Sequence, residues 1–165
     1  GAGRVIATAS SPQKRELALE LGADVAIDSQ AQDMTAAIRE ANGGKRVDVI
    51  LDMTGGRITD ESVNALAPFG RLGFYGQASR EAPKPIAPTN LLVHSTTIAG
   101  MWLPHAFRLP GNVVGQAMSE LFELAIDDQL RVVAGGEYAL ADARLAHEAL
   151  RSRGTTGKLV LNPQL

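Results

Sequence analysis

The chain has no cysteine among its 165 residues, and this absence removes several kinds of site at once. A disulfide framework, a thiolate nucleophile and a thiolate metal ligand are all excluded. Histidine is scarce as well: the three are His94, His105 and His147, and no pair has ligand spacing on one helix face. The sequence therefore predicts no metal site.

Long apolar runs and an excess of positive charge are also missing. No run approaches the roughly 20 apolar residues that a bilayer-spanning helix needs. The first residues lack the basic region, apolar core and cleavage site of a secretory signal. A net charge of -2 provides no basic surface for nucleic acid. We expect a globular protein in the cytoplasm, with neither a membrane nor a nucleic acid as partner.

Short apolar segments bounded by Gly, Asp and Pro alternate with helical patterns along the chain. Strands are predicted at 5–9, 25–28, 47–52, 71–76, 96–102, 138–140 and 158–161. Helices are predicted at 12–22, 33–41, 60–66, 112–127 and 141–152. A proline-rich stretch, Ala82–Pro88, is predicted to be a loop, because proline cannot join a central strand. This alternation predicts an α/β fold with a mostly parallel sheet and flanking helices.

Small or hydroxylated residues follow three of the predicted strands. They are Ser10 and Ser11 after the first strand, Thr54–Gly56 after the third, and Gly76 and Gln77 after the fourth. The carboxyl ends of parallel strands form the ligand crevice of an open α/β sheet, and glycine there lets a ligand approach the backbone. We therefore expect a binding site at this edge, although tight turns alone would also explain the glycines.

Five segments together resemble the medium-chain dehydrogenase/reductase superfamily, in particular its zinc-independent quinone oxidoreductase branch. They are S-S-P-Q-K-R at 10–15, L-G-A-D at 21–24, G-G-K-R-V-D-V-I-L-D-M-T-G-G at 43–56, L-A-P-F-G-R-L-G-F-Y-G-Q-A-S at 66–79, and R-G-T-T-G-K-L-V-L at 153–161. The resemblance covers essentially the whole chain. It implies a Rossmann-type dinucleotide-binding domain over residues 1–127 and a C-terminal segment, 128–165, that in relatives completes the substrate domain.

The resemblance also implies a first βα unit, with a glycine-rich pyrophosphate turn, ahead of Gly1. Without that unit the central strand of the sheet is absent. We expect the chain alone to form two half-sheets with unpaired edges and to be inactive, binding dinucleotide weakly or not at all. We further expect strand pairing between chains, a missing segment supplied separately, or a rearranged sheet, and a homodimer through the strand Thr96–Trp102.

The cofactor implied by the resemblance is NADPH. Hydroxyls at Ser10 and Ser11 and cations at Lys14 and Arg15 suit the 2′-phosphate, whereas an NAD enzyme usually places an acidic residue at this strand end. A solvated first helical turn with surface charges would also explain these side chains. The other implied cofactor-binding residues are Thr54, Gly55, Tyr75, Gly76, Gln77, Gly100 and Met101. One departure is Ile27-Asp28-Ser29, where the family often has a tyrosine that stacks on the adenine.

The activity implied is hydride transfer from NADPH to a small-molecule quinone or other α,β-unsaturated carbonyl substrate. No residue qualifies as a general acid or base, so the catalytic residues are unknown. Three alternatives stay open. They are a fragment of a zinc-dependent alcohol dehydrogenase, a non-catalytic dimerising fragment of a cofactor domain, and a methyltransferase-like fold, which would favour an acidic residue where this chain has Ser10.

Overall fold

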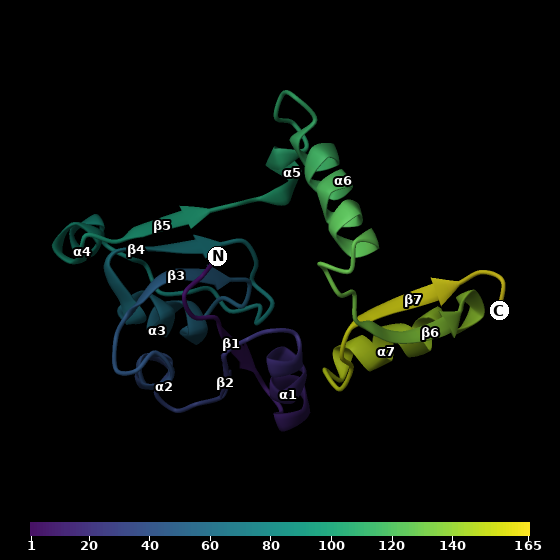
Figure 1. Cartoon of the computed structure of the whole chain (residues 1–165), viewed down its shortest axis with the longest axis horizontal. Coiled ribbons are helices and arrows are strands. Elements are labelled where there is room, and N and C mark those ends of the chain that lie inside the picture. Colours follow the sequence, from purple (N-terminus) through teal and green to yellow (C-terminus); the bar gives the residue numbers. More distant parts are fainter. The chain divides into compact units, whose positions relative to one another are not determined.

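A computed structural model describes all residues, 1–165 (Figure 1). Every strand pairing is parallel, and the strands form three separate sheets, β1–β2, β3–β4–β5 and β6–β7. The chain divides into two compact units, Gly1–Pro110 (unit 1) and Gly111–Leu165 (unit 2). This division precedes the predicted domain boundary after residue 127, which stays a prediction.

Unit 1 alternates strands and helices, and this confirms the predicted α/β class. Its elements are β1 (Ile6–Ala9), α1 (Pro12–Glu20), β2 (Val25–Asp28), α2 (Met34–Ala41), β3 (Val47–Asp52), α3 (Arg57–Ala65), β4 (Leu66–Phe74), α4 (Pro88–His94), β5 (Thr97–Gly100) and α5 (Leu103–Ala106). In Figure 1, β3, β4 and β5 lie side by side, with α2 and α3 on one face of this sheet.

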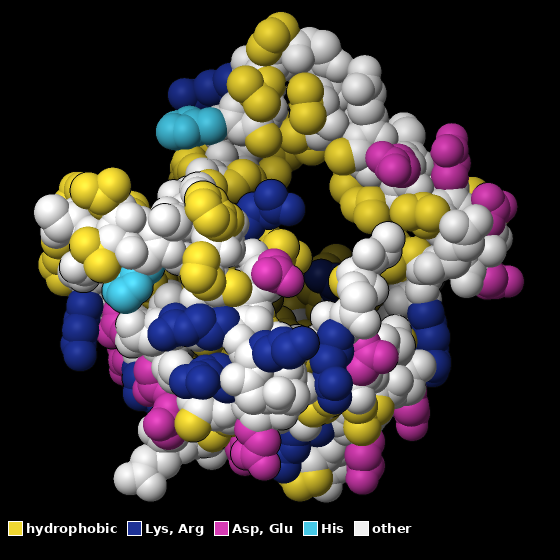
Figure 2. Space-filling view, turned by 60° about the vertical axis from the view of Figure 1, so that its left-hand side comes forward, with side chains coloured by type: hydrophobic (Ala, Val, Ile, Leu, Met, Phe, Trp, Pro, Cys, Tyr) yellow, Lys and Arg dark blue, Asp and Glu magenta, His cyan; other side chains and the backbone are white.

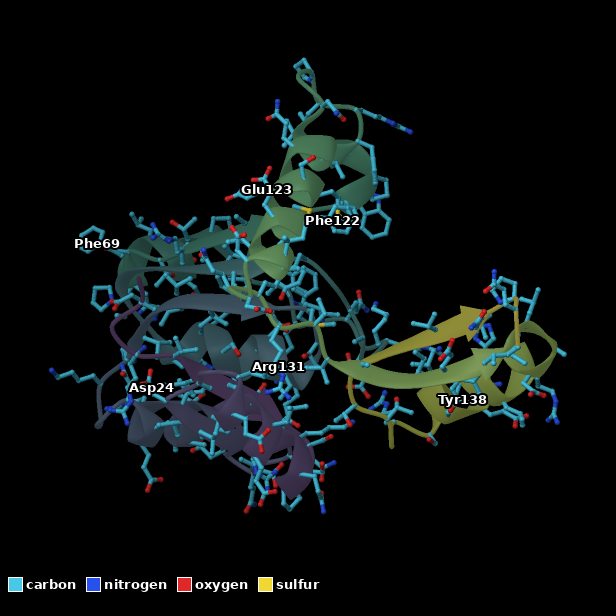
Figure 3. The ribbon with its side chains drawn as sticks, turned by 45° about the vertical axis from the view of Figure 1, so that its right-hand side comes forward. Asp24, Phe69, Phe122, Glu123, Arg131 and Tyr138 are labelled. Carbon is cyan, nitrogen blue, oxygen red and sulfur yellow. The ribbon has the colours of Figure 1, made fainter.

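Local side-chain bonds set the ends of the first elements. Ser11 is the N-cap of α1, since its hydroxyl accepts from the Lys14 N–H, and Pro12 follows at the position where proline is tolerated. Asp33 caps α2 by accepting from the Ala36 N–H at 2.8 Å. Asp24, labelled in Figure 3, accepts from the Val5 N–H at 2.7 Å and so fixes the start of the β1–β2 pair.

Several predicted boundaries were wrong. Strand β5 covers Thr97–Gly100 rather than 96–102, and strand β6 covers Ala134–Ala139 rather than 138–140. Helix α3 begins at Arg57 rather than near Asp60, because Gly56, at φ 58°, ends the preceding turn and serves as its N-cap. Strand β4 covers Leu66–Phe74 rather than 71–76. It pairs first through Leu66 and Val47 and then shifts register, with Phe69 at φ 64° bulging outward. Phe69 is 86% exposed and lies at the margin of unit 1 (Figure 3).

The proline-rich loop prediction is confirmed for residues 82–87, which have no regular structure, whereas Pro88 is the first residue of α4. The sequence analysis missed two short helices, α4 and α5, each of which has a proline in its first turn. Pro88 occupies the first turn of α4 and Pro104 that of α5, a position at which proline favours a helix start rather than a loop.

The two sheets of unit 1 are joined by helix packing and not by a backbone ladder. No strand pairs with β1 on the side away from β2, or with β3 on the side away from β4, which confirms the two predicted half-sheets. Helices α2 and α3 form the core between them through Met34, Ile38 and Ala65. Glu61 on α3 strengthens this contact, because its carboxylate accepts from the Met34 N–H and its carbonyl from the Thr35 hydroxyl.

Unit 2 consists of α6 (Val113–Ile126), β6 (Ala134–Ala139), the 3₁₀ turn η1 (Leu140–Asp142), α7 (Ala143–Arg151) and β7 (Lys158–Asn162). Ala146, the one buried residue of α7, lies on the helix that packs against β6 and β7. Tyr138 lies on β6 (Figure 3), where its neighbour Glu137 accepts from the Asn162 side chain on β7. The structure contains no helix that is both long enough and apolar enough to cross a membrane.

Candidate functional site

The turn after β3 is held by a buried carboxylate. Asp52 is 3% exposed, and its Oδ1 accepts from the backbone N–H groups of Thr54 at 2.7 Å and Gly55 at 3.4 Å. Its Oδ2 accepts from the Thr59 hydroxyl at 2.5 Å. Burying a carboxylate is costly unless donors replace its water. Here three donors do so, and they fix the backbone of the turn that carries two predicted site residues.

The segment after β4 lies directly against this turn. The Ala78 N–H donates to the Met53 carbonyl at 3.0 Å, and the Ser79 N–H donates to the Thr54 carbonyl at 2.8 Å. The approach is so close that a Cβ on Gly76 would lie 2.9 Å from the Met53 carbonyl oxygen. A Cβ on Gly55 would lie 2.9 Å from the Gln77 side chain. Glycine at position 76 therefore lets the two backbones meet, while Gly55 leaves room for the Gln77 side chain and adopts a φ of 81° that favours glycine.

The end of β5 completes this edge of the sheet. The Met101 N–H donates to the Phe74 carbonyl at 2.9 Å, and Gly100 pairs with Phe74 in the β4–β5 register. Nothing lies within 4 Å of a Cβ built on Gly100, so this strand end is open. Seven predicted site residues are thus brought together at the carboxyl ends of β3, β4 and β5: Thr54, Gly55, Tyr75, Gly76, Gln77, Gly100 and Met101.

The other predicted site residues gather at the carboxyl end of β1. Ser10 is exposed and Ser11 and Lys14 are half-buried, all around the N-terminus of α1. The first turn of this helix has no acidic residue, and its dipole directs partial positive charge toward the strand end. Hydroxyls, an ammonium group and a helix N-terminus together can hold a phosphate.

Arg15 does not extend into solvent from this helix. Its Nη1 donates to the Ala9 carbonyl at 3.2 Å and lies 3.4 Å from Oδ2 of Asp28, at the end of β2. Sequence reasoning treated Asp28 only as a departure from a family residue and missed this contact. The sequence marks Ala9 and Asp28 only as the last residues of two predicted strands, and the β1–β2 register of the structure is what places them side by side.

The predicted site uses only one edge of the sheet, and a cavity lies at the opposite one. It has a volume of about 300 Å³, and its lining includes Arg46, Asp60, Lys84, His94 and Thr96. It lies beside the amino ends of β4 and β5 and contains none of the predicted site residues. No group of three or more His, Cys, Asp or Glu side chains is arranged to hold a metal ion.

Residues 1–123 match the model of a protein family described as zinc-binding dehydrogenase. The chain belongs to this family. The resemblance to the medium-chain dehydrogenase/reductase superfamily and its quinone oxidoreductase branch is thereby confirmed. The family name describes the family and assigns no zinc ion to this member.

Individual relatives of this zinc-binding dehydrogenase family member agree with that placement. It is 32% identical over 162 residues to a probable quinone oxidoreductase of Schizosaccharomyces pombe, covering 95% of this chain and 46% of that protein. It is 31% identical to a 2-haloacrylate reductase of Burkholderia sp., covering 97% of this chain and 48% of that protein. A mycobacterial protein solved in complex with NADPH is 35% identical with a TM-score of 0.82, over 97% of this chain and 50% of that chain. The chain spans about half the length of the curated relatives it matches.

Proposed function

We propose that this chain is the dinucleotide-binding part of an oxidoreductase that uses NADPH to reduce quinones or related α,β-unsaturated carbonyl compounds. One observation carries the proposal: Ser10, Ser11 and Lys14 surround the N-terminus of α1 at the end of a parallel strand. The mycobacterial relative solved with NADPH supports the choice of cofactor.

The residues at the end of β1 fit a 2′-phosphate by their chemistry. Lys14 supplies positive charge, and Ser10 supplies a hydroxyl from an exposed position. The Ser11 oxygen already accepts from the Lys14 N–H, but its hydroxyl hydrogen can still be donated to an anion. Neither β1 nor the first turn of α1 contains the carboxylate that would repel a phosphate.

The ends of β3, β4 and β5 would hold the nicotinamide half of the cofactor. Asp52 keeps the Thr54–Gly55 turn rigid, and this turn is bonded to the segment that carries Gly76 and Gln77. A rigid, preformed surface orients a bound group without the cost of ordering the chain. The cofactor supplies a hydride when bound, and the residues of this edge position it.

The named relatives support the proposed substrate class. Quinone oxidoreductases and a 2-haloacrylate reductase match at 32% and 31% identity, so identity does not separate them. Quinones and 2-haloacrylates both contain a carbon–carbon double bond conjugated to a carbonyl or carboxyl group, and such a bond accepts a hydride. An enzyme assay that follows NADPH consumption with quinones, enones and acrylates would define the substrate, in the protein that carries this chain.

The cofactor assignment is tested by the substitution Lys14→Ala. A charge-assisted contact to phosphate contributes roughly 1.5–3 kcal/mol, so the Kd for NADPH should rise about tenfold or more. The Kd for NADH should barely change, because NADH has no 2′-phosphate. Isothermal titration calorimetry with both cofactors provides the comparison.

The control is Lys45→Ala, which removes the same charge at the amino-end side of β3, away from the proposed site. It should leave both dissociation constants unchanged. Equal weakening of NADPH and NADH by Lys14→Ala would contradict the 2′-phosphate assignment. If neither cofactor bound the unaltered protein, the non-catalytic alternative would replace the proposed function.

A further inference from the structure

A carboxylate lies beside the proposed phosphate-binding residues, on the neighbouring strand. In the β1–β2 register Ala9 pairs with Asp28, and the Ser29 N–H donates to the Ala9 carbonyl at 3.1 Å. Ser10 and Ser11 follow Ala9 directly. Asp28 thus brings a negative charge to the strand end at which a negatively charged 2′-phosphate would bind.

The Asp28 carboxylate is held in place by one contact at each oxygen. Its Oδ1 accepts from the Gln30 N–H at 2.9 Å, in a turn local to the end of β2. Its Oδ2 faces Nη1 of Arg15 at 3.4 Å. Arg15 is further fixed by its bond to the Ala9 carbonyl, so the guanidinium lies between the ends of the two strands.

This ion pair contributes little to the stability of the fold. The Asp28 side chain is 46% exposed, and exposed pairs contribute little to stability. The pair has a larger effect on a nearby anion. A carboxylate without a paired cation repels a phosphate, and a carboxylate that is paired with a cation repels it much less. A contact that matters little to the fold can therefore matter to the choice between NADPH and NADH.

We propose that Arg15 determines cofactor specificity through Asp28, neutralising a carboxylate that would otherwise exclude the 2′-phosphate. Arg15 is then a positioning and charge-balancing residue that need not touch the cofactor. Lys14 and the two serines make the direct contacts. The inference rests on the proposed function, because it concerns the 2′-phosphate of the same cofactor.

A double-mutant cycle tests this, with NADPH and NADH titrated into the protein that carries this chain. Arg15→Gln should raise the Kd for NADPH about tenfold, an order of magnitude set by repulsion between close charges, and leave the Kd for NADH within about twofold. Asp28→Asn alone should lower the Kd for NADPH or leave it unchanged. The double variant Arg15→Gln, Asp28→Asn should recover most of the affinity that Arg15→Gln loses.

Two further variants distinguish the effect of the charge at position 15 from the effect of removing any surface cation and from a loss of folding. Arg39→Gln removes an exposed cation at the end of α2 and should not change the preference. Arg15→Lys keeps the positive charge and should retain most of the preference for NADPH over NADH. This variant tests the charge even if Arg15→Gln folds poorly. Added salt should shrink the defect of Arg15→Gln, since it screens exposed charges.

The outcomes distinguish this inference from the function on which it rests. If the double variant binds NADPH as weakly as Arg15→Gln, then Arg15 contacts the phosphate directly and the inference is wrong. Equal loss of NADPH and NADH in Arg15→Gln would also overturn it, in favour of a structural role. If the unaltered protein shows no preference for NADPH and Lys14→Ala changes nothing, the proposed function fails, and the inference fails with it.

Discussion

The Thr59 hydroxyl, in the first turn of α3, donates a 2.5 Å hydrogen bond to the buried Oδ2 of Asp52 at the end of β3. Thr59 and Asp52 are both almost fully buried, at 2% and 3% exposure. The bond therefore links a strand end to the helix that follows it, across the turn on which Thr54 and Gly55 lie. The local geometry of the proposed nicotinamide edge depends on this pair.

Removing the Asp52 side chain should destabilise unit 1 more than any surface change on the same strand. Asp52→Ala leaves the Thr59 hydroxyl and two backbone N–H groups without their acceptor, at a cost of about 2–4 kcal/mol in the free energy of unfolding. Thr59→Val removes one donor and should cost about 1 kcal/mol. Urea denaturation measures both. Asp48→Ala, at an exposed position of β3, is the control and should change the free energy of unfolding by no more than about 0.5 kcal/mol.

The close approach of two backbones at Gly76 should make even a methyl group harmful there. In Gly76→Ala the new Cβ would lie 2.9 Å from the Met53 carbonyl oxygen and 3.2 Å from its Cα, which are backbone atoms that cannot swing aside. We expect the free energy of unfolding to fall by about 1–3 kcal/mol, as at other overpacked sites. Gly100→Ala meets no atom within 4 Å and should be tolerated. Similar denaturation midpoints for the two variants would show that the turns are not packed this tightly.

Met34 should be among the most sensitive apolar positions, because it fills the core that joins the two half-sheets. Its side chain is fully buried between α2 and α3. Met34→Ala should cost about 2–5 kcal/mol through lost contacts and a residual cavity. Met118→Ala on α6 removes the same atoms from a side chain that is 42% exposed, and its effect should be much smaller. Thermal unfolding followed by circular dichroism compares the two, and equal shifts would contradict this view of the core.

The homodimer through Thr96–Trp102 stays a prediction, and the structure suggests how to test it. β5 ends the sheet order β3–β4–β5, so its outer edge has no partner within the chain and is available to another strand. Trp102→Glu should convert a dimer to monomer in sedimentation velocity, because a new charge would be buried in the interface. Phe107→Glu is a matched control, since both aromatic side chains are 67% exposed, but Trp102 lies two residues after the end of β5 whereas Phe107 follows α5. A dimer unaffected by Trp102→Glu would exclude this interface.

Much of unit 1 could be predicted because its signals are local. The apolar run Val47–Asp52 forms β3 as expected, and Asp33 caps a helix that ends at Ala41. The predicted site residues at the ends of β3, β4 and β5 could be placed at one edge because parallel strands share their direction. In contrast, the bulge at Phe69 depends on a bond from its N–H to the Ser95 carbonyl, a residue far along the chain. No local pattern reports such a contact.

The Arg15–Asp28 contact shows a second limit of sequence reasoning. The two side chains meet only because β1 and β2 pair in one register, and a shift by one residue would turn Asp28 to the other face. The role of Asp52 was missed for a similar reason: the pattern marks it as the last residue of a strand, while its three donors come from the turn and from α3.

The position of β4 between two neighbours has a consequence for local opening. It is the one strand of unit 1 with partners on both sides, while β1, β2, β3 and β5 each have a free edge. Backbone amides at a free edge exchange with solvent through small fluctuations, whereas the amides of a central strand exchange only when a larger part of the sheet opens. Leu72, fully buried on β4, should therefore be among the slowest amides of unit 1 in hydrogen–deuterium exchange. Its rate would report when the β3–β4–β5 sheet opens as a whole, independently of the β1–β2 pair.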